Sequence, residues 1–216
     1  MQTPRRHQSS TSGLLMLLLA AGAVAADQTV EPVSIEAGSA SFEAGTNVPG
    51  IEIKGASSNL SGRANVSHGA SGLVIDQIHV TLPVKSLATG MKVRDEHMRK
   101  YIFTNADGQV PDVEFAADQV TCRKNGGAED FLCQVAGSLT IRGVAHAFST
   151  ALNVKEQSSA AGATFRASGD GVVKLSDYGI PLPKQFGVST TDEVKLKISF
   201  VGRTSPTQTA GSGGAR

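Results

Sequence analysis

The sequence of 216 residues has no tryptophan, only two tyrosines and only two cysteines, and its aromatic residues amount to 5% of the chain. Its formal net charge of +1 leaves no basic excess of the kind that nucleic-acid binding needs. No apolar run approaches the roughly 20 residues of a membrane-spanning helix. These deficits argue against a nucleic-acid partner and against a helical membrane protein. The 24 glycines instead indicate a turn-rich chain, and we expect a predominantly β protein.

Residues 1–26 have the pattern of a cleaved signal peptide. A polar start with Arg5 and Arg6 and no acid is followed by a short apolar stretch and then by small residues. Cleavage after Ala25 or Ala26 leaves about 190 residues, which suffice for one domain with its own core. The arginine pair leaves export by the twin-arginine route open, although the polar residues after it favour the ordinary secretory route. We therefore expect a periplasmic or secreted protein.

Cys122 and Cys133 flank a loop centred on Gly126-Gly127, with a β-like run on each side. A hairpin around this loop places the two cysteines opposite each other, where strand residues are close enough to bridge. An oxidising compartment allows the bond. The spacing fits neither a C-x-x-C motif nor a zinc site, and no histidine pair accompanies it. The two residues therefore predict a structural disulfide.

Alternation of apolar and polar residues with a period of two dominates the chain from Ile35 onward. The apolar residues that share a parity fall into three clear sets: Val194, Leu196, Ile198 and Phe200; Val74, Ile78, Val80 and Leu82; and Val113, Phe115 and Ala117. Segments rich in glycine, proline, serine and asparagine separate the runs. Short strands at this density, without repeated helices between them, predict an antiparallel sandwich or barrel.

One segment, residues 92–102, is charged, lacks alternation and contains good helix formers, so we expect one short helix there. We expect a single domain over residues 27–204 and a flexible tail over 205–216. A barrel of about eight strands is either filled by its own side chains or holds one ligand. The abundance of alanine and glycine favours a cavity, but periodicity alone does not decide between the two.

The sequence carries few signs of catalytic chemistry. The histidines outside the signal, His68, His79, His97 and His146, have no metal-ligand spacing, and neither a G-x-S-x-G motif nor a phosphate-binding loop occurs. Adjacent carboxylates such as Asp95 and Glu96 point in different directions on a helix and favour a solvated surface. We predict no catalytic residue, no metal and no cofactor, and therefore a protein that is not an enzyme.

Four motifs follow one another between residues 94 and 180: Arg94–Arg99 (RDEHMR), Pro111–Phe115 (PDVEF), Gly137–Gly143 (GSLTIRG) and Asp177–Ile180 (DYGI). In this order and spacing they resemble the YceI-like family of polyisoprenoid-binding, lipocalin-like periplasmic proteins, over about residues 42–202. The resemblance implies an extended eight-stranded antiparallel barrel with one short helix. It also implies a bound polyprenyl chain or isoprenoid quinone, and no catalytic residues.

The motif matches suggest residues for the site. Those expected to line the lumen are Phe103, Phe115, Leu139, Ile141, Tyr178 and Ile180. Arg94 and Asp95 either form an ion pair or cap that braces the barrel, or contact the head of the ligand. Gly137 and Gly143 are expected to relieve crowding or to permit a bulge rather than to touch the ligand.

Three functions remain open at this stage. The first is a soluble carrier or store for an amphiphilic isoprenoid lipid. The second is an accessory module that hands quinone to a membrane redox partner, and the third, which the residues favour least, is a lipid-modifying enzyme. The first predicts extractable lipid, the second a membrane partner and the third a polar constellation inside the lumen. Neither the identity of the lipid nor a homodimer is decided by the sequence.

Overall fold

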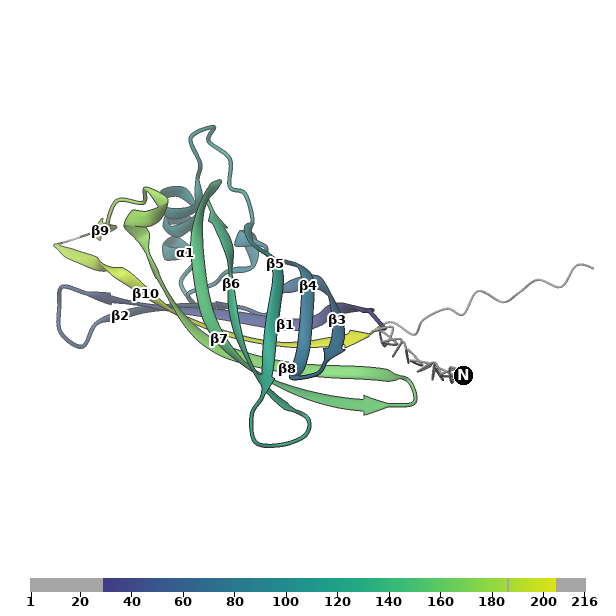
Figure 1. Cartoon of the computed structure of the whole chain (residues 1–216). Coiled ribbons are helices and arrows are strands. Elements are labelled where there is room, and N and C mark those ends of the chain that lie inside the picture. The colour runs from purple at the N-terminus through teal and green to yellow at the C-terminus, as the bar shows by residue number, and fades with distance from the viewer. Residues whose placement is uncertain (1–28, 186, 205–216) are drawn as a thin grey trace, which may run out of the picture.

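The computed structural model describes residues 29–185 and 187–204 (Figure 1). The predicted signal peptide, 1–26, and the predicted tail, 205–216, lie outside the described residues. The described strands are β1 (Glu31–Thr46), β2 (Glu52–Ser57), β3 (Ser61–Gly69), β4 (Gly72–Leu82), β5 (Val113–Lys124), β6 (Asp130–Ile141), β7 (Val144–Ser159), β8 (Gly162–Lys174), β9 (Lys184–Gln185) and β10 (Val188–Thr204). The helical elements are η1 (Val84–Ser86), α1 (Lys92–Met98), η2 (Arg99–Phe103) and η3 (Leu175–Tyr178).

The strands close into a barrel because β1 pairs with β10 along almost its whole length, from Val33 opposite Thr204 to Thr46 opposite Thr190. The first part of β1 pairs with β3 and its second part with β2, so that these two short strands share one place in the wall. All pairings between named strands are antiparallel, in the order β1-β3-β4-β5-β6-β7-β8-β10. The expected all-β, eight-stranded antiparallel barrel is confirmed. Closure pairs β1 with β10, the two strands that would be the edges of the open sheet.

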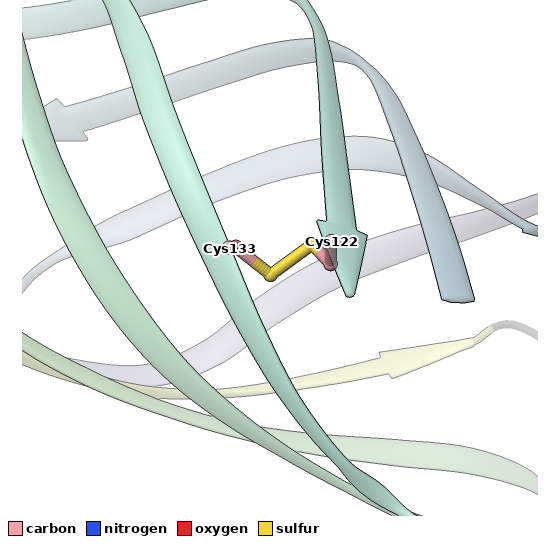
Figure 2. The surroundings of a disulfide bond; sticks show 2 residues. All are labelled: Cys122 and Cys133. Carbon is pink, nitrogen blue, oxygen red and sulfur yellow. A yellow bond between two sulfur atoms is a disulfide. The ribbon is translucent and has the colours of Figure 1, made fainter. Parts of the chain in front are cut away.

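The predicted hairpin is formed by β5 and β6, and Cys122 lies directly opposite Cys133 in it. The two residues form a disulfide with their Cα atoms 4.1 Å apart, and both are fully buried. Figure 2 shows the bond bridging the two neighbouring strands near the end of β5. The predicted disulfide is therefore confirmed.

The helix expected at residues 92–102 is also present, as α1 followed by the π-helical turn η2. The parity predicted for β4 is wrong at Val74. Gln77 has a left-handed φ of 53°, and the alternation changes face there. Ile75, which precedes Gln77, and Ile78, which follows it, both line the interior of the barrel. Val74 therefore does not share their face. A backbone irregularity of this kind re-aims side chains.

The two ends of the barrel differ. Helix α1, β9 and the β1–β2 hairpin gather at one end, whereas the described chain begins and ends at the opposite end (Figure 1). A bridge between Ala56 and Ala88 and a backbone hydrogen bond from Asn47 to Ser189 join segments of the first end. We call this end the mouth, and define it by residues 46–52, 89–104 and 179–188.

Candidate functional site

The barrel encloses a cavity of about 1140 Å³, and all eight barrel strands contribute to its wall. Near the end opposite the mouth it is lined by Val33, Val66 and Phe165, and at the mouth by Val93 and Leu182. Strand β10 alone contributes residues from Val188 to Gly202. The lumen is therefore a long space left open by side chains that are too small, or too far apart, to fill it.

The wall of the cavity is almost entirely apolar. The polar or charged side chains that line it are Arg63, Thr89, Arg94, His97, Tyr101, Thr150, Lys184 and Thr190. Neither an aspartate nor a glutamate occurs among the described lining residues. An apolar molecule can enter such a space without leaving a carboxylate unpaired in a medium of low dielectric constant, which would be costly.

Six of the eight residues that the motifs singled out line this cavity: Arg94, Phe103, Phe115, Leu139, Ile141 and Ile180. They come from five separate elements or connections, and the barrel brings them together. Phe115 lies opposite Leu139 in the β5–β6 pairing and packs edge-on against Phe148, with ring centroids 6.1 Å apart. That these residues contact a ligand stays a prediction.

Arg94 and Asp95 both hold Thr89, in the segment that leads into α1. Arg94 Nη2 donates a hydrogen bond to the carbonyl of Thr89 at 2.7 Å. The Asp95 carboxylate accepts one from the Thr89 backbone N–H at 2.7 Å and another from the Thr89 hydroxyl. These two bonds hold the pKa of Asp95 below its usual value, with a smaller contribution from the positive charge of Arg99. Asp95 is thus part of a brace at the mouth and does not line the cavity.

Tyr178 also lies outside the cavity lining. Its side chain is buried in the core near the mouth, where its ring packs edge-on against His146 with centroids 5.9 Å apart. Burial, and to a lesser degree the negative charge of Asp177, raises the pKa of Tyr178 to about 12. The tyrosine of the Asp177–Ile180 motif, at the end of η3, thus packs in the core, while Ile180 lines the cavity.

Two groups of lining residues were missed from the sequence. Phe148 and Phe200 belong to alternating runs, and their parity with lining residues such as Leu152 and Leu196 is the signal that could have assigned them. The second group consists of residues that line the cavity at the mouth and are nevertheless exposed: Ile51, Met91, Val93, Tyr101 and Leu182. They lie in segments without alternation, so no periodic signal marks them.

Within the described ranges, no group of three or more histidine, cysteine, aspartate or glutamate side chains is placed to hold a metal ion. None of the helices in residues 29–185 and 187–204 is both long enough and apolar enough to cross a bilayer.

Solved structures with the same fold exist. A polyisoprenoid-binding domain from Saccharophagus degradans, implicated in plant cell wall breakdown, superposes with a TM-score of 0.57 at 18% identity over 80% of this chain and 98% of that chain. BcnA from Burkholderia cenocepacia gives 0.53 at 20% identity over 76% and 95%. The YceI protein of Campylobacter jejuni gives 0.54 at 20% identity over 73% and 88%. At these identities the likeness shows the fold.

Sequence comparison points the same way. A UPF0312 protein of Pseudomonas paraeruginosa is 30% identical over 129 residues, which cover 59% of this chain and 62% of that protein. The chain thus matches somewhat less than two thirds of the length of this relative. The model of the YceI-like domain matches residues 29–202, which include all eight barrel strands up to Gly202. The closed barrel, its apolar lumen and this match together show that the chain belongs to the family of YceI-like domains.

Proposed function

We propose that this protein binds one long apolar lipid in its lumen, a polyprenyl chain or an isoprenoid quinone, and carries or stores it in the periplasm. The observation that carries the proposal is the apolar cavity of about 1140 Å³ along the barrel. A related fold in Saccharophagus degradans is described as polyisoprenoid-binding, which supports the same class of ligand here. The proposed role is one of binding without catalysis.

The size of the cavity suits such a ligand. At roughly 30 Å³ per non-hydrogen atom, the volume of a water molecule in the liquid, the lumen holds on the order of 40 atoms, or about eight isoprene units. Each methylene-sized group removed from water contributes about 0.8 kcal/mol. Because this contribution is non-directional, we expect ligands of similar length and bulk to bind with similar affinity.

The polar residues of the lining set the orientation of the ligand. Arg94, His97 and Tyr101 line the cavity at the mouth, whereas the lining around Val33, Val66 and Phe165 at the opposite end is apolar except for Arg63, whose side chain is exposed. An amphiphile therefore binds with its hydrocarbon tail directed toward the disulfide end and its polar head near α1. A few convergent polar groups in an otherwise apolar pocket are the usual means of fixing orientation.

Mass spectrometry tests the proposal, with native spectra of protein purified from its own host followed by denaturation and solvent extraction. We expect a stoichiometric adduct that is released as a polyprenyl lipid or a quinone. Protein that is free of lipid, and that takes up no quinone added in detergent, contradicts the proposal.

A pair of variants on β1 connects the adduct to the lumen. Ala40 lines the cavity, whereas Ala37 is exposed on the same strand. Ala40→Phe places a bulky ring in the lumen and should abolish or shorten the bound lipid, and Ala37→Phe should leave it unchanged. Equal lipid content in both variants, with both folded, would show that the lipid binds elsewhere.

A further inference from the structure

The mouth of the cavity is surrounded by exposed apolar side chains. Nine large hydrophobic residues are exposed in the described chain, and five of them line the cavity at the mouth: Ile51, Met91, Val93, Tyr101 and Leu182. We call these five the rim. Their exposed fractions lie between 47% and 61%. They come from the β1–β2 connection, the residue that precedes α1, α1 itself, η2 and the η3–β9 connection, so the rim surrounds an opening and is not the face of one helix. Exposed apolar residues that cluster in this way mark an interaction site.

Basic side chains accompany the rim. Lys92, Lys100 and Lys184 are exposed at the mouth, and none of the three forms an ion pair with a described residue. Lys100 Nζ lies 5.2 Å from the ring centroid of Tyr101, a member of the rim. Of the acids in the segments that define the mouth, the exposed Glu52 is paired with Lys54 and the buried Asp95 is bonded to Thr89, while Glu96 is exposed. The mouth is therefore apolar at its opening and positively charged around it.

We propose that the mouth is a membrane-docking surface, which places the rim in the outer part of an anionic phospholipid bilayer and the three lysines against its headgroups. An apolar side chain beside a lysine is the arrangement by which proteins bind at the bilayer interface. Each lysine near an anionic surface adds about fivefold to binding. The described chain begins and ends at the far end of the barrel, so neither of these ends covers the rim (Figure 1).

The geometry favours a bilayer over a protein partner. A protein interface buries a continuous packed patch, whereas the rim surrounds the entrance of a cavity whose lining is mostly apolar. Docked on a bilayer, this entrance faces the acyl chains, and a lipid passes from one apolar medium to the other without crossing water. Docking requires only the rim and the lysines, while the passage of lipid through the mouth rests on the proposed function.

Vesicle flotation tests the docking, with vesicles of phosphatidylcholine alone and vesicles that also contain phosphatidylglycerol. We expect the protein to float with the anionic vesicles. Lys92→Gln, Lys100→Gln and Lys184→Gln together should lower its partition coefficient on the order of 100-fold. The matched control, Lys124→Gln, Lys174→Gln and Lys197→Gln, removes the same charge from exposed positions on the barrel wall and should retain binding.

A second set of variants tests the apolar rim. Met91→Ser, Val93→Ser and Leu182→Ser together should lower the partition coefficient at least tenfold, on the basis of about fourfold per methylene-sized group. Val172→Ser should have no effect, because Val172 is exposed on the wall and does not line the cavity. Urea unfolding confirms that each variant is folded.

The other outcomes overturn either the docking surface or the proposed function, and they distinguish the two. Equal losses in the two lysine triples would show general electrostatic attraction without a docking face. Binding that requires membrane proteins in the vesicles would show a protein partner. Protein that floats with neither vesicle but takes up quinone from detergent would remove the docking surface and leave the proposed function standing. Protein that floats with the anionic vesicles but takes up no quinone would remove the proposed function and leave the docking surface standing.

Discussion

Asp95 and Thr89 are joined by two hydrogen bonds, since the carboxylate of Asp95 accepts both the backbone N–H and the hydroxyl of Thr89. Thr89 lies just before α1, and Asp95 lies within it. The pair therefore ties the start of the helix to the segment that precedes it and holds α1 at the mouth. Arg94 completes this brace by donating to the carbonyl of Thr89 while also lining the cavity.

The brace predicts a pH-dependent stability. Because the pKa of Asp95 is lowered in the folded protein, its contribution is present above the unfolded value of about 3.8 and is lost as the pH falls through the folded value. Thr89→Val removes the hydroxyl donor and should lower the melting temperature at neutral pH. The difference in melting temperature between the variant and the unmodified protein should then narrow below pH 3.8. Thermal unfolding across pH measures it, with Thr121→Val, on the exposed face of β5, as the control. A difference that stays constant with pH would argue against the brace.

Gly137 predicts a steric cost. A Cβ atom at this position would lie 2.3 Å from the carbonyl oxygen of Ala116 and 2.7 Å from Cζ of Phe115. Gly137→Ala should therefore lower the free energy of unfolding by about 1–3 kcal/mol, the usual cost of overpacking. In Gly69→Ala the nearest contact is 3.4 Å, so its stability should change little. Urea titrations measure the unfolding midpoints of the two variants. Equal midpoints would show that the backbone at Gly137 is not crowded.

The disulfide predicts a response to reductant. Cys122 and Cys133 are 11 residues apart, and closing a loop of this size typically stabilises a protein by about 2–4 kcal/mol. The double variant Cys122→Ala, Cys133→Ala should lose about this amount. Dithiothreitol should lower the denaturation midpoint of the unmodified protein and leave that of the double variant unchanged. A midpoint of the unmodified protein that does not respond, with reduction verified by thiol titration, would show that the bond contributes little.

Tyr178 predicts a late titration. Its pKa is raised from 10 to about 12 by burial and by the charge of Asp177. A raised pKa means that the folded state disfavours the phenolate, so the contribution of Tyr178 to stability is complete below pH 10 and declines as the pH rises toward 12. Absorbance titration of tyrosinate should show a transition near pH 12 that is missing in Tyr178→Phe. A transition of Tyr178 near 10 would show that its ring is not buried as described.

The motifs single out residues near the cavity but do not by themselves tell which of them face it. Phe115 and Leu139 come from separate motifs and lie opposite each other on the cavity wall. Tyr178 and Ile180 belong to one motif, yet only Ile180 lines the cavity. Two residues apart is the spacing that shares a face in a strand, but η3 ends at Tyr178, and Gly179, with a left-handed φ of 63°, separates it from Ile180.

The sequence by itself determined what depends on neighbours along the chain. Alternation marked the strands, the charged segment around Arg94 marked the helix, and the loop at Gly126 set Cys122 opposite Cys133, because a hairpin register follows from its turn. Only the tertiary structure decided the rest. The closure of β1 on β10 joins residues as distant as Val33 and Thr204. The cavity is a difference between the space enclosed by eight strands and the volume of their inward side chains, which no local pattern contains.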